Sequence, residues 1–450
     1  MSSVTISCRN IHNAQRSIVE CTVPPDKSIL HRALFLGALS ESIITIPVTE
    51  SVGDDIISTI NALRQLAVPI EFEGSQIVIT GVGKNGLHKS DKPIDCRNSG
   101  TTARLLMGIL SAQDFESTLV GDSSLSTRPM KRIATVLNEE LGADIITSES
   151  GTLPVCINGR TLQNAAVRLP VASAQIKSSL LLAAFCSGTS LEVIEPLQSR
   201  DHTERMFRQF GVDVQTSAVK IFLPERRTFV LPKEFDYNVP GDISSASFLI
   251  AAAAITRTDI SINNVGINQT RSGVLQVLSN SGIPIFVNTI SEFSGERSGN
   301  VRIAGSHIIT FRPFSLDASS VPNVQDEIPA LSVIALFADG VSNFAGASEL
   351  RLKESDRIST LYHNLTAFGA NIVERSDGLT IHGDKNFIGK ALVIDHSGDH
   401  RIAMAMSVAA LCSGGEVIIP DSNVVTISYP NFFETLTTIA SQSGCIITSN

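Results

Sequence analysis

Six segments of the chain begin with polar residues and then become almost entirely apolar, with small and aliphatic side chains. This pattern predicts helices that are buried on nearly every side and are polar only where they start. Their first residues recur at steps of 71 to 83 positions. The segments are 27–39 (KSILHRALFLGAL), 98–110 (NSGTTARLLMGIL), 173–185 (SAQIKSSLLLAAF), 244–255 (SSASFLIAAAAI), 327–338 (EIPALSVIALFA) and 400–411 (HRIAMAMSVAAL). The chain is therefore expected to repeat one structural unit six times.

A second, more amphipathic helix is predicted in each copy, and five of these six helices stop at a glycine. A glycine favours the left-handed conformation that closes a helix before a strand. The residues at the stop are Gly142, Gly211, Gly282, Gly369 and Gly444, with Ala67 in the first copy. A β-rich run such as 42–48 (SIITIPV) follows each buried helix, and a hairpin-like pair such as 371–383 (NIVERSDGLTIHG) follows most amphipathic helices.

The unit is thus helix, strand, helix, strand, strand, over about 70 to 80 residues, which is longer than typical solenoid repeats. Six such units favour two globular halves of three. The segment 237–242 (YNVPGD) interrupts the pattern between the third and fourth copies with Pro240 and Gly241. A chain of 450 residues with 43% hydrophobic residues is long enough for two such domains. We expect them to face one another across a cleft.

Charge and hydropathy exclude several classes of partner. The net charge is −9 and the acidic and basic residues are interspersed, which excludes a nucleic-acid or membrane partner recruited by global charge. Apolar runs such as 248–255 are far shorter than the ~20 residues that span a bilayer. The opening MSSVTISCRN lacks the pattern of a secretory signal. A cytoplasmic location is expected.

The cysteines indicate neither a disulfide framework nor a zinc site. There are seven, an odd number, and they are scattered without a CxxC motif or a cluster with histidine. Cys96 and Cys186 lie in or beside apolar segments and are expected to be packed thiols. No metal site is predicted.

The polar starts of the six buried helices are candidate anion-binding positions. A helix N-terminus offers free N–H groups and about half a positive charge, so six together supply only about +3. Two phosphorylated small molecules, at roughly −1.5 to −2 per phosphate, with a carboxylate each would carry about −5 to −6. Side-chain cations are therefore required. They stand beside the repeats at Lys27, Arg32, Arg128, Lys353, Arg357 and Arg401.

Nine motifs, in order from about residue 24 to 434, carry a family resemblance. They are PDKSILHRA, NSGTTARLL, GDSSLSTRPM, VASAQIKSS, SRDHTERM, VPGDISSASF, DEIPAL, LRLKESDRI and DHRIAMA. Together they resemble the motifs of the 5-enolpyruvylshikimate-3-phosphate synthase family.

The resemblance implies an α/β fold of two domains, an inside-out α/β barrel. Each domain would contain three βαβαββ units around buried parallel helices. The N-terminal domain would span 24–238, and the C-terminal domain would combine 1–23 with 241–450, with a hinge near 237–242. No cofactor is implied, and a monomer is expected because the family is usually monomeric.

The resemblance also implies the reaction, which belongs to the shikimate pathway of aromatic amino-acid (chorismate) biosynthesis. The carboxyvinyl group of phosphoenolpyruvate would pass to the 5-hydroxyl of shikimate 3-phosphate by addition and elimination, with release of phosphate. This chemistry needs a proton donor, a proton acceptor and dense positive charge, but no metal or redox cofactor.

An enolpyruvyl transferase that acts on another acceptor, such as a UDP-sugar, is the alternative. The related UDP-N-acetylglucosamine enzyme normally carries a reactive cysteine shortly before an Arg-Pro pair. The corresponding loop here, residues 121–129, reads GDSSLSTRP and has no cysteine. The shikimate branch is therefore favoured.

Residue roles follow from the matching motif positions. The catalytic candidates are Asp326, facing the reacting hydroxyl, Glu354, a proton shuttle for the methylene, and Lys27. Binding of shikimate 3-phosphate is expected at Lys27, Ser28, Arg32, Ser173, Ala174, Gln175, Ser199, Arg200, Asp326 and Lys353. Binding of phosphoenolpyruvate is expected at Lys27, Asn98, Gly100, Arg128, Gln175, Glu354, Arg357 and Arg401. Asp399 and His400 are expected to orient the region of Arg401.

Three positions depart from the best-studied branch of the family. Ala174 stands where the best-studied branch has a second serine, Glu349 where it has an asparagine, and Ile427 where it has a lysine that would contact phosphoenolpyruvate. Gly100 leaves room for glyphosate, the family's known inhibitor, where tolerant relatives carry alanine. Sensitivity to glyphosate is therefore expected.

Overall fold

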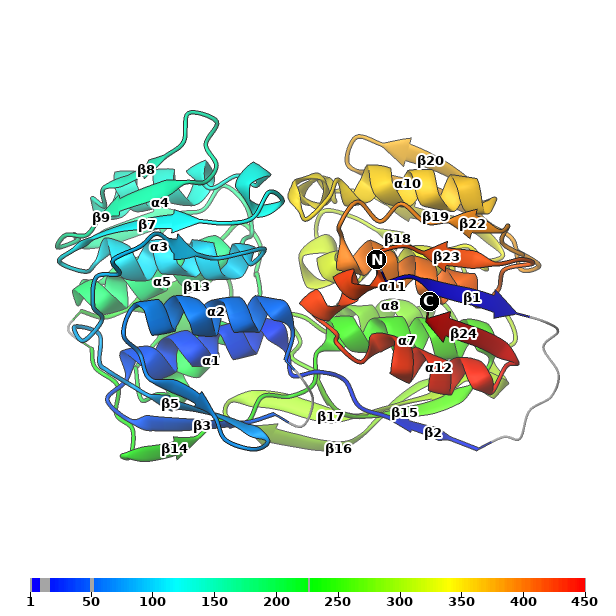
Figure 1. Ribbon diagram of the computed structural model, residues 1–450, viewed down its shortest axis with the longest axis horizontal. Helices are drawn as coiled ribbons and strands as arrows, with labels where there is room; N and C mark the ends of the chain where they lie inside the picture. The colour runs from blue at the N-terminus through cyan, green and yellow to red at the C-terminus, as the bar shows by residue number, and fades with distance from the viewer. Residues whose placement is uncertain (1, 9–16, 49–51, 226, 450) are drawn as a thin grey trace. The chain divides into compact units, whose positions relative to one another are not determined.

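The computed structural model describes residues 2–8, 17–48, 52–225 and 227–449. Each of the six predicted apolar segments forms a helix whose residues are almost all buried (Figure 1). They are α1 (Lys27–Leu39), α3 (Gly100–Ser111), α5 (Ala174–Ser187), α7 (Ile243–Thr256), α9 (Ile328–Ala335) and α11 (His400–Ala410). The prediction of six buried helices is confirmed, because an apolar surface on all sides of a helix can only be satisfied inside a core.

The second helix series alternates with the first. It consists of α2 (Asp54–Gln65), α4 (Lys131–Leu141), α6 (His202–Gln209), α8 (Gly273–Asn280), α10 (Arg357–Phe368) and α12 (Phe432–Ser441). All six predicted stop residues have positive φ, including the non-glycine Ala67 at 66°. Gly142 and Gly369 are the left-handed C-caps of α4 and α10. The glycine stops therefore mark the helix ends as expected.

Three four-stranded sheets are formed by residues of the first half of the chain. Their strand orders are β14-β3-β5-β4, β6-β7-β9-β8 and β10-β11-β13-β12. The bounds are β3 (Ile43–Pro47), β4 (Ile70–Phe72), β5 (Gln76–Thr80), β6 (Ile94–Asp95), β7 (Glu116–Val120), β8 (Ile145–Thr147), β9 (Val155–Asn158), β10 (Ala165–Arg168), β11 (Leu191–Ile194), β12 (Gln215–Ser217), β13 (Lys220–Leu223) and β14 (Glu234–Asp236).

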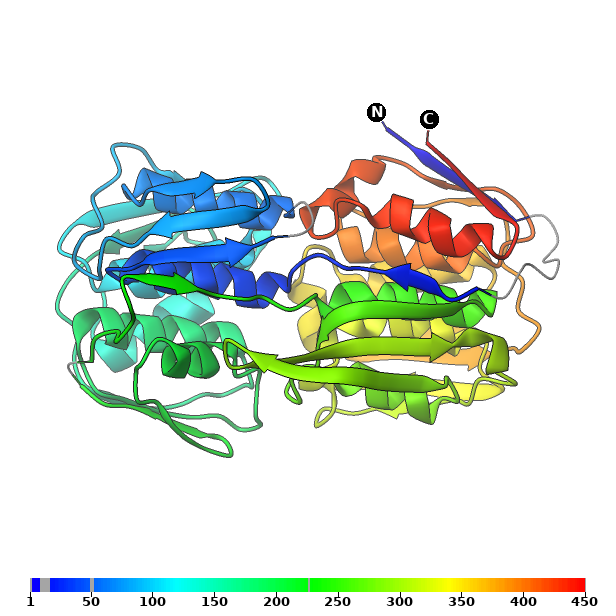
Figure 2. The same cartoon turned by 90° about the horizontal axis from the view of Figure 1, so that it is seen from below.

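Three further four-stranded sheets are formed by the second half together with the N-terminal strands. Their orders are β16-β17-β15-β2, β18-β19-β21-β20 and β22-β23-β1-β24, and Figure 2 shows the long strands of the first of them alongside β2. The bounds are β1 (Val4–Cys8), β2 (Val19–Cys21), β15 (Asp259–Gly266), β16 (Ile285–Phe293), β17 (Glu296–Ala304), β18 (Ser315–Leu316), β19 (Gly340–Phe344), β20 (Asn371–Arg375), β21 (Gly378–Gly383), β22 (Leu392–Val393), β23 (Val417–Ile419) and β24 (Cys445–Ser449).

Every sheet has the same internal pairing, which defines the βαβαββ unit. In four sheets, the strand before a buried helix pairs in parallel with the strand after it, as β10 does with β11 in the register Ala165↔Leu191. In the other two sheets the partners are exchanged: β14, before α7, pairs with β3, and β2, before α1, pairs with β15. The remaining two strands are antiparallel to one another; β12 and β13 form a hairpin of this kind, and β13 pairs with β11. In the sheet of β22 and β23 the two are instead β1 and β24, from the two ends of the chain. A parallel pair needs a crossover, and the buried helix supplies it. The predicted α/β fold of six repeated units is confirmed.

The chain separates into two compact units. The N-terminal unit comprises Pro25–Val239 together with Glu292–Glu296, and the C-terminal unit comprises the residues up to Pro24, Pro240–Ser291 and the residues from Arg297 onward. Each unit has its own cluster of buried apolar residues. The tip of the β16–β17 hairpin, which belongs to the N-terminal unit, was not anticipated from the sequence.

The interpretation of the cysteines was wrong in one respect. Cys8 and Cys445 form a disulfide although the odd, scattered set of cysteines argued against one. The two residues lie directly opposite one another in the antiparallel pair β1–β24, which brings both ends of the chain together in the C-terminal unit (Figure 1). Sequence spacing could not reveal a pair that only strand register creates. In the described part of the chain, no helix is long and apolar enough to cross a membrane.

Candidate active site

The N-terminal unit holds the starts of three buried helices, each capped by a polar side chain. Asp26 accepts hydrogen bonds from the backbone N–H groups of Ser28 (2.8 Å) and Ile29 (3.1 Å) at the start of α1. Ser99 accepts one from Thr102 (3.3 Å) at α3, and Ser173 accepts one from Ile176 (3.4 Å) at α5. Each cap satisfies only part of the first turn, so other N–H groups remain available for an anion.

Two predicted cations of α1 have protein partners in this structure. The Nζ of Lys27 lies 2.6 Å from Oδ2 of Asp55, at the start of α2. Arg32 is 3% exposed and donates to Ser178 Oγ and Thr203 Oγ1, both at 2.7 Å. Its guanidinium therefore ties α1 to α5 and α6, which is a structural role in addition to the ligand role expected from the sequence.

Two hydrogen-bonded groups surround the start of α3. Arg104 Nη1 donates to Gln175 Oε1 at 3.0 Å, and Gln175 Nε2 donates to Thr101 Oγ1 at 3.1 Å, so the first turns of α3 and α5 are joined. Arg128 Nη2 donates to Asn98 Oδ1 at 2.7 Å. The predicted residues Asn98, Arg128 and Gln175 thus lie beside one helix start.

Two arginine side chains closely approach Gly100, the first residue of α3. A Cβ at this position would lie 2.7 Å from Arg104 Nη1 and 3.3 Å from Arg128 Nη1. The absence of a side chain therefore allows both guanidinium groups to reach the start of α3. Backbone and two cations therefore meet at this helix start, and binding of a ligand here stays a prediction.

A buried hydrogen-bond chain joins α1, α2 and α3 behind these residues. His31 Nδ1 lies 2.7 Å from Thr59 Oγ1, which lies 2.6 Å from Thr102 Oγ1, and Thr102 donates to Ser99 Oγ at 2.7 Å. Burial, together with the charges of Lys27 and Arg32, holds the pKa of His31 well below its ordinary value. A neutral imidazole therefore supports the helix starts without adding charge.

The remaining predicted residues of this unit lie at the same helix starts or in the loop after β11. Ser28 and Ala174 are in the first turns of α1 and α5. Ser199 is buried and Arg200 half-buried in the loop that leads to α6. Ser199 donates through its Oγ to Glu195 Oε1.

In the C-terminal unit, Arg357 at the start of α10 is the centre of the cluster. Its Nε donates to Asp399 Oδ2 at 2.8 Å, and its Nη2 donates to Glu354 Oε2 at 2.5 Å. Its Nη1 lies 3.4 Å from Asp326 Oδ1. One guanidinium thus contacts both predicted catalytic carboxylates and the N-cap residue of α11.

Two more predicted cations surround Asp326. Arg401 Nη1 donates to the backbone carbonyl of Asp326 at 2.8 Å, and its Nη2 lies 3.9 Å from Oδ2. Lys353 Nζ lies 3.8 Å from Asp326 Oδ1. All five residues predicted in this half of the chain are therefore brought together.

Positive and negative side chains are equal in number in this cluster. Three cations, Lys353, Arg357 and Arg401, face three carboxylates, those of Asp326, Glu354 and Asp399. Burial opposes the charged form of Arg357, but Asp399, Glu354 and Asp326 together raise its pKa above the ordinary value. The guanidinium therefore stays protonated, and an incoming anion competes with these carboxylates for it.

Two contacts of the site were missed from the sequence. Arg104 lies within the motif NSGTTARLL, and its place as a lone arginine in an apolar helix could have indicated a role at the site. Asp55 gave none, because its pairing with Lys27 depends on how α1 and α2 pack. Two of the residues that depart from the best-studied branch lie in short helices. Glu349 is half-buried in the helix Ser348–Leu352, and Ile427 is the last residue of the helix Ser422–Ile427.

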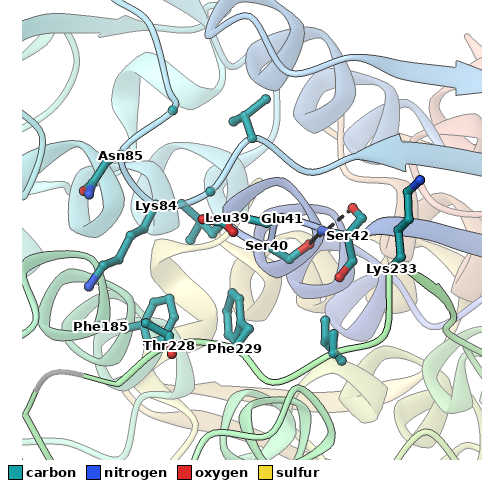
Figure 3. Close-up of a pocket in the computed structure, with 14 residues that line it drawn as sticks. Leu39, Ser40, Glu41, Ser42, Lys84, Asn85, Phe185, Thr228, Phe229 and Lys233 are labelled. Carbon is teal, nitrogen blue, oxygen red and sulfur yellow. Dashed lines mark hydrogen bonds between the residues drawn. The ribbon is translucent and has the colours of Figure 1, made fainter.

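A cavity of about 810 Å³ in the N-terminal unit lies away from these residues (Figure 3). Leu39 and Ser40, at the end of α1, line it together with Phe185, in the last turns of α5. Leu39 is twelve residues after Lys27, a rise of about 18 Å along the helix. None of the predicted site residues lines this cavity, so it is not the candidate active site.

Among the described residues, no group of three or more His, Cys, Asp or Glu side chains is placed to hold a metal ion. The two sets of residues instead combine helix N-termini with arginine and lysine side chains, which suits phosphate and carboxylate groups.

The fold is similar to that of a solved enolpyruvyl transferase. It superposes on the enolpyruvyl transferase NikO from Streptomyces tendae with a TM-score of 0.77, covering 100% of this chain and 99% of that one, at 16% identity. A likeness at this identity concerns the fold alone.

The family is shown by closer relatives. A family profile described as EPSP synthase (3-phosphoshikimate 1-carboxyvinyltransferase) matches residues 11–436. The 3-phosphoshikimate 1-carboxyvinyltransferase of Leuconostoc citreum is 41% identical over 422 residues, covering 93% of this chain and 96% of that protein. The EPSP synthase structure from Acinetobacter baumannii covers 100% of both chains at 38% identity, with a TM-score of 0.83. This chain belongs to the EPSP synthase family. The enzyme class predicted from the motifs is confirmed, and the UDP-sugar alternative finds no support among these relatives.

Proposed function

We propose that this chain transfers the carboxyvinyl group of phosphoenolpyruvate to the 5-hydroxyl of shikimate 3-phosphate and that both sets of residues described above serve this reaction. The observation that carries the proposal is the meeting of Asp326, Glu354 and Arg357. Two carboxylates on one buried guanidinium provide proton-transfer groups beside a fixed positive charge.

The N-terminal unit supplies groups for both substrates. Ser28, Ser173, Ala174 and Gln175 are at helix starts, where backbone N–H groups favour the phosphate of shikimate 3-phosphate. Lys27, Arg32, Ser199 and Arg200 complete this proposed phosphate site. Asn98, Gly100 and Arg128 are assigned to phosphoenolpyruvate, because Gly100 admits two guanidinium groups to one helix start.

The C-terminal unit supplies the proton-transfer groups. In the addition step, the methylene carbon of phosphoenolpyruvate gains a proton while the 5-hydroxyl loses its own and bonds to the adjacent carbon. In the elimination step, a proton leaves the new methyl group and the C–O bond to phosphate breaks. Glu354 and Asp326 are the proposed proton carriers, and Lys353, Arg357 and Arg401 stabilise the negative charge of the adduct.

The balanced charges of the cluster suggest how binding and chemistry are linked. An anion that takes hydrogen bonds from Arg357 releases Glu354 or Asp326 from part of its ion pairing. Such a released carboxylate accepts a proton more readily. Substrate binding would thereby prepare the proton carrier.

The proposal is tested by phosphate release from phosphoenolpyruvate with shikimate 3-phosphate, with a UDP-sugar as the alternative acceptor. Release only with shikimate 3-phosphate supports it, and release only with the UDP-sugar overturns it. Glu354→Gln should lower kcat at least a hundredfold, because the amide cannot carry the proton. Glu349→Gln, a nearby carboxylate outside the Arg357 cluster, serves as the control and should retain kcat within about threefold.

We also propose that the enzyme is a cytoplasmic monomer that needs no cofactor. Light scattering coupled to gel filtration tests the first point: a mass near 48.0 kDa supports it and a mass near twice that value overturns it. Full activity after treatment with a chelator would support the second.

A further inference from the structure

A buried group of one lysine and two glutamates lies behind the proposed phosphate site of the N-terminal unit. Lys177 Nζ is 2.8 Å from Glu195 Oε2 and 2.8 Å from Glu204 Oε1. The three side chains are each at most 2% exposed. Buried ion pairs of this kind contribute little net stability compared with apolar replacements, so their presence calls for another explanation.

The first function of the group is to hold Ser199. The carboxylate of Glu195 accepts a hydrogen bond from Ser199 Oγ and lies 3.4 Å from Ser199 N. Lys177 Nζ lies 3.5 Å from the carbonyl oxygen of Ser199. The Lys177–Glu195 pair therefore holds Ser199 through its N–H, hydroxyl and carbonyl groups, and the hydroxyl has to turn from Glu195 to donate to a phosphate.

These contacts shape the loop that carries two proposed ligands. The loop runs from the end of β11 at Ile194 to the start of α6 at His202. Because Glu195 bonds to a residue four positions later, the intervening segment is closed into a tight turn. Ser199 and Arg200 lie at the end of this turn, so their positions depend on Glu195.

The same lysine fixes the loop to a second ligand-bearing segment. Lys177 lies in the first turn of α5, three residues after Ala174 and two after Gln175. One helical turn is rigid, so the ammonium holds the loop at a set position relative to the N-terminus of α5. The proposed phosphate ligands of α5 and of the loop are thereby held together.

Glu204 is chemically distinct from Glu195 within the group. Its Oε2 is buried and has no hydrogen-bond partner among the described residues. Burial raises the pKa of Glu204 above its ordinary value, although Lys177 acts in the opposite direction. Glu204 contacts Lys177 through Oε1, whereas Glu195 is the carboxylate that contacts Ser199, and this makes Glu204 a natural control for Glu195.

We propose that Glu195, acting with Lys177, is a positioning residue for shikimate 3-phosphate: it orders Ser199 and Arg200 against the first turn of α5. This inference rests on the proposed role of those residues in binding the substrate phosphate. It assigns no part in proton transfer to Glu195.

The test compares Glu195→Gln with Glu204→Gln in steady-state kinetics. The two oxygens of Glu195 face three donors, and a glutamine would turn its NH₂ group towards at least one of them. Glu195→Gln should raise the KM for shikimate 3-phosphate about tenfold, the equivalent of losing one charge-assisted hydrogen bond. The KM for phosphoenolpyruvate and kcat should stay within about twofold. Glu204→Gln should leave all three constants unchanged.

A purely structural role would give a different result. Lower stability reduces the amount of folded enzyme and therefore the apparent kcat, but it does not raise one KM selectively. Equal changes in both KM values, or a change in kcat alone, would overturn the inference. So would a Glu204→Gln variant as impaired as Glu195→Gln.

A second variant covers the case in which Glu195→Gln does not fold. The triple change Lys177→Met, Glu195→Leu and Glu204→Leu replaces the whole buried ionic group by apolar side chains, which proteins tolerate well. It should raise the KM for shikimate 3-phosphate to a similar extent, and an unchanged KM would overturn the inference. Calorimetric binding of shikimate 3-phosphate gives the same comparison without turnover. An inactive wild type would therefore count against the proposed function, whereas equal affinities of wild type and variant would count against the positioning role.

Discussion

The Nε of Arg357 lies 2.8 Å from Oδ2 of Asp399, and both side chains are at most 1% exposed. Asp399 also caps α11 by accepting a hydrogen bond from the backbone N–H of Arg401 at 2.9 Å. One carboxylate thus sets the positions of two arginines that are assigned to phosphoenolpyruvate. Asp399 therefore supports the Arg357 cluster, although the sequence indicated only a role in orienting the region of Arg401.

Asp399→Ala should be among the most damaging changes in the C-terminal unit. It leaves a buried guanidinium without its main partner, which costs about 3–5 kcal/mol, and it removes a helix cap worth about 1 kcal/mol. We expect an early unfolding transition in urea and a loss of kcat/KM for phosphoenolpyruvate of at least a hundredfold. Asp356→Ala is the matched control, because Asp356 caps α10 but is paired with the partly exposed Arg351. A control as damaged as Asp399→Ala would contradict this explanation.

Gly100→Ala should weaken binding of phosphoenolpyruvate and of glyphosate while the protein stays folded. The new Cβ would meet the Arg104 guanidinium at 2.7 Å, so this flexible end must shift away from its bond with Gln175. We expect a several-fold rise in the KM for phosphoenolpyruvate, an unchanged melting temperature and a larger inhibition constant for glyphosate. Wild-type enzyme that is indifferent to millimolar glyphosate would refute the prediction.

His31 should make the stability of the protein depend on pH. Burial depresses its folded-state pKa far below the ordinary value of 6.5, so the unfolded chain binds the proton first as the pH falls. Stability should therefore be complete above about pH 6.5 and decrease below it, by up to about 1.4 kcal/mol per pH unit for this group.

The check for His31 is the free energy of unfolding at pH 7.5 and pH 5.5. His31→Gln should flatten the dependence by the contribution of one proton. The exposed His88 provides the control, and His88→Gln should leave the slope as in the wild type. A slope that His31→Gln does not change would show that other groups cause it.

The Cys8–Cys445 disulfide should stabilise the oxidised protein. It joins residues 437 positions apart, so it restricts the unfolded chain strongly, and a contribution of about 2–4 kcal/mol is expected. Reductant should lower the urea midpoint of the wild type and have no effect on Cys8→Ser. Cys412→Ser removes a thiol that is free and should respond to reductant like the wild type. Equal midpoints with and without reductant would contradict the prediction.

Much of the fold could be predicted because it follows from local patterns. A helix such as α7, apolar on all sides, has to be buried wherever it occurs, and a glycine such as Gly142 ends a helix through its own backbone freedom. The same holds for the order of elements in each unit. Motif positions likewise indicated the five residues that meet around Arg357.

The contacts between distant segments could not be predicted in this way. Glu195 contacts Ser199 and Lys177 only after β11, α5 and α6 have packed together. Asp55 contacts Lys27 only because α2 packs against α1.

The amino-acid sequence by itself thus determined the repeated units, the buried helices and the identity of the charged residues, because short-range periodicity and chemistry suffice for these. The tertiary structure alone decided which charges neutralise one another and which cysteines pair. Those outcomes depend on distances of a few ångströms between side chains that are far apart along the chain, and only packing sets such distances.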